Sequence, residues 1–437
     1  MHWPVEAATE VLPLPEVNQR RLAQDLRMLA HIGASPGGGI NRLAFTAEER
    51  EAHSYVAARM REAGLTVRGD AIGNTFGCRP GGREGLPAIV LGSHLDSIYE
   101  GGQFDGTVGV VGALEAVRAL NEQNIATLHP IIAVAFAAEE GARFGASNLG
   151  SRALVGDLPQ EELRRLHDGN GTSVAVAIQQ LGFPLKEIPT CRWDSRQVGA
   201  FVELHIEQSA GLETLRKPVG IVDAIGAATR LRINLIGRPD HSGATSMSLR
   251  RDALAAAAEI VLNVERIARE TAGRNTVATV GKLNVKPGVI TVVPGEVEMD
   301  IDIRDIDADM KDIATSAMEA MVHEVARRRG IQERIELLTH QLPSTLAMWT
   351  REAIRGVCQE MGVDYRVLPS GAGHDARVMA DLAPAAMILV RNKSGISHSP
   401  AEWVEMSDIV LGVQVLTNTV LKLDDALAQR RGEGKHP

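Results

Sequence analysis

Short apolar runs alternate with amphipathic helical stretches through the first half of the chain. The apolar runs lack the apolar–polar alternation of half-exposed strands, which is typical of central strands covered by helices on both faces. They lie at Ala88–Leu91, Ile131–Ala137 and Val198–Leu204. Helical patterns include Val108–Leu120, in which Gly109 and Gly112 would allow close packing on a sheet, and an earlier helix opened by a capping box of Thr46 and Glu49. The pattern predicts an α/β fold with a mainly parallel central sheet.

The pattern changes in the middle of the chain. Strand, helix, strand, strand, helix and strand follow one another there, an order typical of a ferredoxin-like unit. These elements are expected at residues 229–236, 249–271, 276–283, 297–304, 313–329 and 335–338. Strands of the first kind return at 365–368 and 385–390. We therefore predict one α/β domain formed by residues 1–216 and 336–437, interrupted by a smaller domain at residues 217–335.

Composition narrows the classes of protein that fit this fold. The chain has 437 residues, of which 44% are hydrophobic, enough to bury a core and to exclude a mainly disordered protein. A net charge of −9 disfavours a nucleic-acid surface, and no apolar run reaches the roughly 20 residues of a membrane span. Three scattered cysteines suit reduced thiols, and the first residues lack the pattern of a secretory signal. We expect a soluble, cytoplasmic protein.

Histidines and carboxylates occur where the predicted strands end. The segments are GSHLDS with His94 and Asp96, GGQFDG with Asp105, AAEEG with Glu139 and Glu140, FVELHIEQ with His205, and SGISHSP with His398. A single histidine at a strand end is more often structural than a ligand, and Asp105 between glycines also suits a turn. Ligands of open α/β sheets bind at the carboxyl ends of the strands, however, and imidazoles with carboxylates form the donor set of zinc sites. The coincidence of five such segments favours a metal site.

These segments carry a specific resemblance. GSHLDS, GGQFDGTVGV, AAEEGARFGASNLGSRAL, ELHIEQ, DHSGATSM, SGAGHDA and SGISHSPAEW occur in order between about residues 17 and 423. In them the chain resembles the hydantoinase/carbamoylase branch of the di-zinc aminoacylase–carboxypeptidase metallohydrolases, which includes N-carbamoyl-L-amino-acid hydrolases, β-ureidopropionases and allantoate amidohydrolases. The resemblance implies a di-metal catalytic domain interrupted by a ferredoxin-like lid that also forms the interface of a homodimer.

The resemblance also implies a role for each matched residue of the metal site. His94 and His205 would bind one metal, and Glu140 and His398 the other. Asp105 would bridge the two metals. Asp96 would orient His94, and Glu139 would be the general base that takes a proton from a metal-activated water. The cofactor would be two divalent ions per subunit, zinc in the first place, with manganese, cobalt or nickel suited to the same ligands.

A second set of matched residues would bind the substrate. His241 would reach the active site of the partner subunit and stabilise the oxyanion, and Arg304 would hold the substrate carboxylate. Gln208 and His374 would line the pocket. Thr291 stands where the family usually has an asparagine that hydrogen-bonds the substrate, which leaves the exact substrate open. The histidines that match no motif, His129, His167, His323 and His340, are expected to face solvent.

The predicted activity is hydrolysis of a linear amide C–N bond in an N-substituted amino acid. The leading substrate is an N-carbamoyl-L-amino acid, a small molecule with a carboxylate, and the products are the amino acid, carbon dioxide and ammonia. Allantoate or ureidoglycine-type hydrolysis, deacylation and dipeptide cleavage are alternatives that would use the same catalytic residues. A non-catalytic binding protein on this fold is disfavoured, because every implied metal ligand and the base are present.

Overall fold

The computed structural model describes residues 15–270 and 275–433. The chain forms two compact units. The larger unit comprises Met1–Ile221, Met348–Arg366 and Asp381–Pro437, and the smaller unit comprises Val222–Ala347 and Val367–Ala380. The domain boundaries expected from the sequence stay a prediction, and the chain start, on which the expectation about a secretory signal rests, lies outside the described residues.

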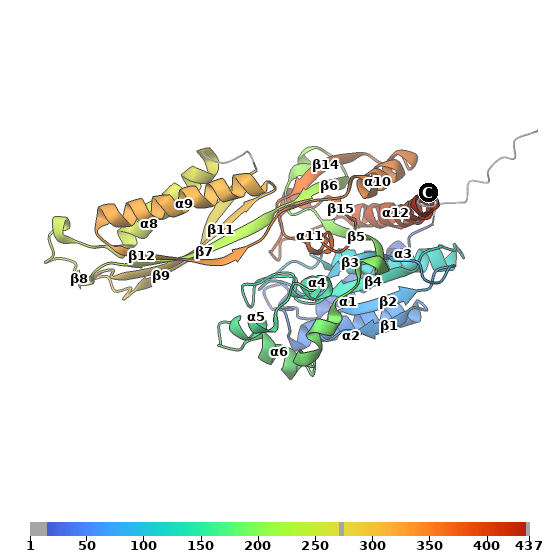
Figure 1. The fold of residues 1–437 in the computed structure, drawn as a ribbon, viewed down its shortest axis with the longest axis horizontal. Coiled ribbons are helices and arrows are strands. Elements are labelled where there is room, and N and C mark those ends of the chain that lie inside the picture. The colour runs from blue at the N-terminus through green and yellow to red at the C-terminus, as the bar shows by residue number, and fades with distance from the viewer. Residues whose placement is uncertain (1–14, 271–274, 434–437) are drawn as a thin grey trace, which may run out of the picture. The chain divides into compact units, whose positions relative to one another are not determined.

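A twisted sheet forms the centre of the larger unit (Figure 1). Its strands are β1 (Thr66–Gly69), β2 (Thr75–Arg79), β3 (Ala88–His94), β4 (Ile131–Phe136), β5 (Val198–Ile206), β15 (Ala385–Val390) and the first half of β6 (Val219–Ile225). They follow the order β1-β2-β4-β3-β5-β15-β6, in which β4, β3, β5 and β15 are parallel neighbours and the outer strands are antiparallel. The predicted α/β fold with a mainly parallel central sheet is confirmed.

The helices of the larger unit are α1 (Gln19–His31), α2 (Ala47–Glu62), α3 (Thr107–Glu122), α4 (Leu149–Val155), α5 (Gln160–Arg165), α6 (Val174–Gln180), α7 (Gly211–Thr214), α10 (Met348–Glu360) and α12 (Met406–Glu433), with 3-10 turns at Leu185–Cys191, Ser195–Gln197 and Lys393–Gly395. Helices α2, α3, α10 and α12 pack on the sheet of this unit, and other helices lie around them. Helix α3 packs closely on β3 and β5. Gly109 allows this approach, because a Cβ at this position would lie 2.3 Å from the Leu204 carbonyl oxygen. This packing fixes the turn before α3. In the part of the chain that the structure describes, no helix combines the length and apolarity of a membrane span.

The smaller unit contains the expected strand–helix–strand–strand–helix–strand order. The elements are β7 (Ala227–Ile236), α8 (Ala253–Glu270), β9 (Val277–Lys286), β11 (Glu296–Asp305), α9 (Ala308–Arg329) and β12 (Gln332–His340), and the antiparallel sheet has the order β12-β7-β11-β9. Helices α8 and α9 lie side by side on one face, against the alternate apolar residues of β11 (Figure 1). Helix α8 begins later than predicted, because the Asp252 carboxylate accepts the N–H groups of Leu254 and Ala255 as a cap; Thr271 lies outside the described residues.

Short elements complete the smaller unit. Strands β8 (Asp240–His241) and β10 (Val292–Val293) form a two-stranded ribbon, and β13 (Ser344–Thr345) pairs with the second half of β6. Strand β14 (Tyr365–Ser370), helix α11 (Asp375–Met379) and a 3-10 turn at Met247–Leu249 are the remaining elements. The ribbon positions two residues that the sequence singled out, His241 and Thr291.

Candidate metal centre

The carboxyl ends of four parallel strands bring the candidate ligands together in the larger unit. His94 is the last residue of β3, His205 is next to last in β5, Glu140 follows β4, and His398 lies in the loop after β15. Asp105 lies in the turn before α3. Two overlapping groups result, His94–Asp105–His205 and Asp105–Glu140–His398, and within each group one ligand atom per residue lies within 4.8 Å of the others. Asp105 belongs to both groups.

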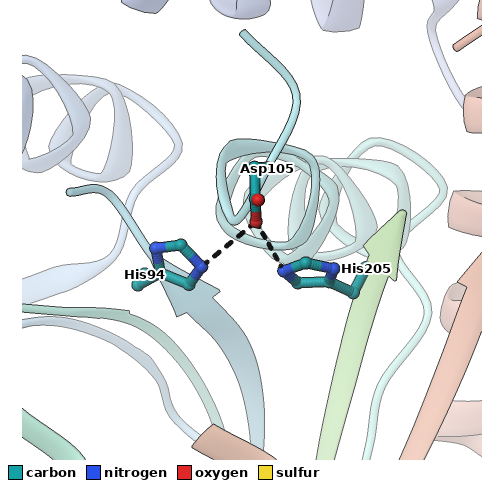
Figure 2. Close-up of side chains that lie close together, drawn as sticks. All are labelled: His94, Asp105 and His205. Carbon is teal, nitrogen blue, oxygen red and sulfur yellow. Dashed lines mark ion pairs between the residues drawn. The ribbon is translucent and has the colours of Figure 1, made fainter. Parts of the chain in front are cut away.

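The first group places two imidazole nitrogens against one carboxylate oxygen (Figure 2). Asp105 Oδ1 lies 3.5 Å from His94 Nε2 and 3.1 Å from His205 Nε2. The opposite nitrogens lie against backbone carbonyl oxygens, His94 Nδ1 at 3.0 Å from Asp96 O and His205 Nδ1 at 2.9 Å from Ile206 O. Since a carbonyl oxygen only accepts, each Nδ1 carries a proton, and the Nε2 atom that faces Asp105 is the nitrogen left to bind a metal. Such an arrangement fits a cation between the three side chains.

The second group uses the other oxygen of the same carboxylate. His398 Nε2 lies 3.3 Å from Asp105 Oδ2 and 3.2 Å from Glu140 Oε1. The side chain of His398 is 47% exposed, whereas Asp105 is buried, so the second group opens toward solvent. Gln208, expected to line the pocket, donates its Nε2 to Asp105 Oδ2 at 2.8 Å. One carboxylate thus offers one oxygen to each ligand group, as a bridging ligand would.

The charges around Asp105 favour a positive centre. Burial alone would lower the pKa of His205, but the Asp105 carboxylate outweighs it and raises this pKa above the ordinary value. Burial would raise the pKa of Asp105, but the three imidazoles hold it well below its usual range. Imidazole nitrogens and carboxylate oxygens are the ligands of zinc and of similar divalent metals. The donor set therefore fits divalent metal ions.

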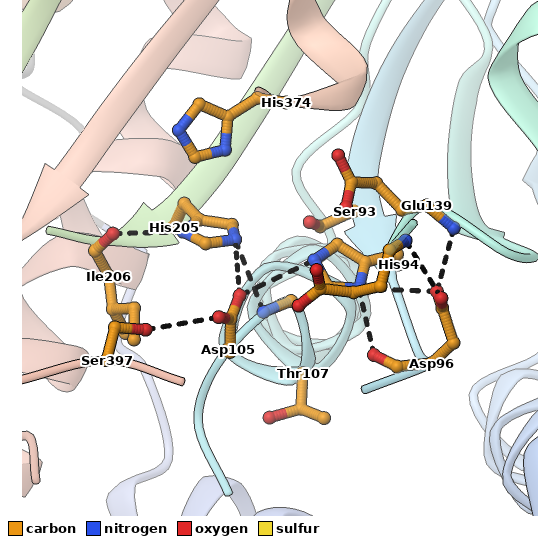
Figure 3. Close-up of polar contacts among 12 residues, drawn as sticks. Ser93, His94, Asp96, Asp105, Thr107, Glu139, His205, Ile206, His374 and Ser397 are labelled. Carbon is orange, nitrogen blue, oxygen red and sulfur yellow. Dashed lines mark hydrogen bonds and ion pairs between the residues drawn. The ribbon is translucent and has the colours of Figure 1, made fainter. Parts of the chain in front are cut away.

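Asp96 makes two different kinds of contact (Figure 3). Its backbone carbonyl oxygen is the nearer acceptor for His94 Nδ1, at 3.0 Å, while its carboxylate Oδ1 lies at 3.5 Å. The carboxylate instead accepts two backbone N–H groups, from Glu139 to Oδ1 and from Glu140 to Oδ2, each at 2.9 Å. The residue expected to orient His94 therefore also holds the backbone that carries Glu139 and Glu140.

Glu139 and its neighbour Asn148 form a buried pair. Asn148 Nδ2 donates to Glu139 Oε1 at 2.8 Å, and the Asn148 backbone N–H donates to the Glu139 carbonyl oxygen at 2.7 Å. Glu139 belongs to neither ligand group among the described residues. Sequence reasoning gave Asn148 no role, although it lies inside the matched segment AAEEGARFGASNLGSRAL. Asn148 holds one oxygen of the expected general base.

Glu402 is another residue that sequence reasoning missed. Its carboxylate accepts the N–H groups of Phe104 and Asp105 at 2.9 and 3.1 Å, and the Ser397 hydroxyl at 2.9 Å. It thus joins the Asp105 turn to the His398 loop. Burial and the Asp105 charge raise the pKa of Glu402 to about 7. Glu402 lies inside the matched segment SGISHSPAEW, and it packs against Gly102, where a Cβ would lie 2.1 Å from Glu402 Oε1.

Two expected substrate residues lie together on the ribbon of the smaller unit. His241 pairs with Val292, and the Ser242 N–H donates to the Thr291 carbonyl oxygen at 3.0 Å. His241 Nδ1 accepts the N–H groups of Gly243 and Ala244, at 3.0 and 3.1 Å. The ring proton therefore lies on Nε2, which leaves this exposed histidine as a hydrogen-bond donor.

The other two expected substrate residues of the smaller unit lie apart from the ribbon. Arg304, on β11, donates to Asp302 Oδ1 and Oδ2 at 2.7 and 3.4 Å, and Arg230 Nε donates to the same carboxylate at 2.9 Å. His374 is buried directly before α11, with its Nε2 at 2.8 Å from Ser370 Oγ. The roles expected for these residues stay predictions.

Comparison with known proteins places this architecture in a family. The sequence model of Peptidase family M20/M25/M40 matches residues 90–422. The chain belongs to this family. Members of the M20 family are metal-dependent hydrolases, so the predicted hydrolase class is confirmed, and the described residues supply candidate ligands for the metal.

Similar M20 proteins extend over almost the whole chain. An N-carbamoyl-L-amino acid amidohydrolase of Geobacillus stearothermophilus is 43% identical over 93% of this chain and 99% of that protein. An allantoate amidohydrolase of Escherichia coli is 34% identical over 93% of this chain and 98% of that protein. A crystal structure of a hydantoinase/carbamoylase family amidase from Burkholderia vietnamiensis matches with a TM-score of 0.86 and 34% identity, over 93% of this chain and 98% of that one. The resemblance seen in the motifs is confirmed.

Proposed function

We propose that the chain hydrolyses the carbamoyl group of N-carbamoyl-L-amino acids, releasing the amino acid, carbon dioxide and ammonia. The observation that carries this proposal is that Asp105 offers one oxygen to each of two ligand groups. The buried Glu139 is the neighbour in sequence of Glu140, a residue of the second group. The N-carbamoyl-L-amino acid amidohydrolase relative, 43% identical, supports this substrate class. The allantoate amidohydrolase relative makes allantoate the second candidate, because the same centre would serve its linear amide.

The residues of the centre would divide the work of hydrolysis. Two divalent ions, zinc in our proposal, would supply an acidified water and a polarised carbonyl when bound. Glu139, held by Asn148, would take the proton of that water and deliver it to the leaving nitrogen. His241, with its proton on Nε2, would donate a hydrogen bond to the oxyanion.

The smaller unit would bind the substrate and a second subunit. We assign it the role of a lid and dimerisation domain, so that the active protein is a cytoplasmic homodimer with sites completed across the interface. Asp302 would orient the Arg304 guanidinium toward the substrate carboxylate, which suits a planar fork of donors. Thr291 has a shorter arm than asparagine and offers one hydroxyl, which favours a larger N-substituted acid over the smallest carbamoyl amino acids.

A substrate screen with controlled metal content tests the proposal. The panel contains N-carbamoyl-L-amino acids of increasing size, carbamoyl-β-alanine, allantoate, N-acetyl amino acids and a carboxamide analogue of the best substrate. We expect ammonia release from the carbamoyl amino acids, loss of activity with a chelator, recovery with zinc, manganese, cobalt or nickel, and little turnover of the carboxamide. Preferred turnover of allantoate would select the second candidate. Chelator-resistant turnover would contradict the metal centre.

Subunit mixing tests the sharing of sites. Subunits carrying His241→Ala and subunits carrying Glu139→Gln should each be almost inactive as pure dimers. A mixed dimer contains one site in which both residues are intact, so mixing should restore activity toward a quarter of the wild-type value at equal amounts of the two variants. The measurement is ammonia release after subunit exchange, with exchange followed by a fluorescent label. Complete exchange without recovery would place His241 in its own subunit's site.

A further inference from the structure

The backbone after β4 is held by side chains from distant parts of the chain. Four successive peptide N–H groups each donate to a side-chain oxygen. The donors are Ala137, Ala138, Glu139 and Glu140, and the acceptors in the same order are Asn74 Oδ1, Glu49 Oε1, Asp96 Oδ1 and Asp96 Oδ2, at 2.9, 2.8, 2.9 and 2.9 Å. This segment carries both the expected base and one expected metal ligand. Its direction therefore decides where two carboxylates point.

Ala138 is the unusual residue in this segment. Its φ is 54°, in the left-handed region that residues with a Cβ rarely adopt. Such a conformation persists only where the surroundings hold it. The carbonyl oxygen of Ala138 accepts the Leu149 N–H at 2.9 Å, and its own N–H is bonded to Glu49. Glu49 thus fixes the peptide that turns the chain immediately before Glu139.

Glu49 does not do what its position in the sequence predicts. In a capping box its side chain would return to the Thr46 N–H, but that N–H donates to the Leu43 carbonyl oxygen. The Glu49 carboxylate, 2% exposed, instead accepts the Phe45 N–H with one oxygen and crosses to Ala138 with the other. Because Thr46 Oγ1 already caps the helix, the bond to Ala138 adds nothing to α2 itself.

We propose that Glu49 is a positioning residue for hydrolysis, which fixes the Ala138 turn and through it the directions of Glu139 and Glu140. Burying a carboxylate is unfavourable unless it is bonded and balanced by charge. Burial and the Asp96 charge raise the pKa of the Glu49 carboxyl to about 8, and the N–H groups of Ala138 and Phe45 and the charge of the buried Arg42 act against this shift. The Arg42 guanidinium itself donates to the Leu29 and Ile32 carbonyl oxygens at 2.8 and 2.9 Å. Both side-chain oxygens of Glu49 are therefore held as hydrogen-bond acceptors.

Replacing one oxygen tests this role. Glu49→Gln keeps the shape but puts an NH2 group against one of the two N–H donors, so the turn loses an acceptor. We expect kcat to fall about 10- to 100-fold with KM changed by less than about threefold, the pattern of an effect on the transition state. Glu49→Asp, which keeps the carboxyl group on a shorter arm, should show the same pattern, and it is the second variant for the case that Glu49→Gln folds poorly.

Glu115→Gln is the matched control. Glu115 is also a fully buried helical glutamate. It accepts the backbone N–H of Asn18 at 2.9 Å and forms an ion pair with Arg21. Its substitution should lower the melting temperature and leave kcat unchanged. When Glu49→Gln is added to Glu139→Gln, the further loss of kcat should be less than about threefold, because the effects of substitutions that act through one group do not add. Unchanged kcat for both Glu49 variants, or a fully additive loss, would overturn the inference.

A second measurement needs no substrate. The inference rests on the proposed function for its turnover assay, but Glu140 lies on the same turn, so Glu49→Gln should also weaken zinc binding at one site. Calorimetric titration of zinc into the metal-free protein should show one affinity lowered about tenfold in Glu49→Gln and Glu49→Asp, and none lowered in Glu115→Gln. If the wild-type protein hydrolyses no compound of the panel, the proposed function is wrong. Unchanged zinc affinities in both Glu49 variants would separately contradict the positioning role of Glu49.

Discussion

Glu139→Gln should lower kcat by about two to four orders of magnitude and leave the metal content unchanged. Glu139 belongs to neither ligand group among the described residues, and Asn148 Nδ2 donates to its Oε1 at 2.8 Å. Glutamine keeps the size of the side chain and can still accept that hydrogen bond, but it cannot take a proton from water. The loss should therefore appear in kcat, with elemental analysis showing the wild-type ratio of metal to protein.

The neighbouring residue supplies the contrast. Glu140 Oε1 lies 3.2 Å from His398 Nε2 in the more open ligand group, so Glu140→Gln should weaken one metal. Added zinc should then restore part of its activity, whereas zinc should not help Glu139→Gln. Equal loss of metal in both variants would mean that the two carboxylates do not divide the roles of base and ligand.

The position of the candidate centre follows from the sequence because parallel strands end at one edge. The unalternating runs at β3, β4, β5 and β15 predict central parallel strands, and each is followed or ended by a histidine or a carboxylate. Knowing that such ends converge is enough to expect His94, His205 and His398 near one another. The structure brings their nitrogens to the two oxygens of Asp105.

The supporting residues could not be found in the same way. Glu402 and Glu49 act through backbone N–H groups that lie 297 and 89 residues away, and no periodic pattern marks a contact between a side chain and a distant peptide. The prediction that His129 faces solvent is wrong for the same reason. His129 is fully buried, with Nδ1 at 2.6 Å from Asp424 Oδ1, a partner 295 residues away. His167, His323 and His340 are exposed, as expected.

Asp105→Asn should abolish tight binding of both metals and lower activity by about three orders of magnitude or more, since a bound metal contributes several kcal/mol to the transition state. The Gln208 amide donates to Oδ2 at 2.8 Å, so the asparagine carbonyl oxygen would take that side. Its NH2 group would then donate toward the Nε2 atoms of His94 and His205. Hydrogen bonds would fill the place of the first metal, and the bridge to the second would be lost.

Thermal unfolding separates this effect from misfolding. A ligand that binds only the folded state at 100 times its dissociation constant stabilises it by about 2.7 kcal/mol, so zinc should raise the melting temperature of wild type. Asp105→Asn should lose that response, and without metal it should be less stable than wild type, because the imidazoles that hold the pKa of Asp105 low lose their charged partner. Asp424→Asn is the matched control, since Asp424 is also a buried aspartate bonded to a histidine. It should lower the melting temperature and keep the zinc response. An unchanged zinc response in Asp105→Asn would remove Asp105 from the centre.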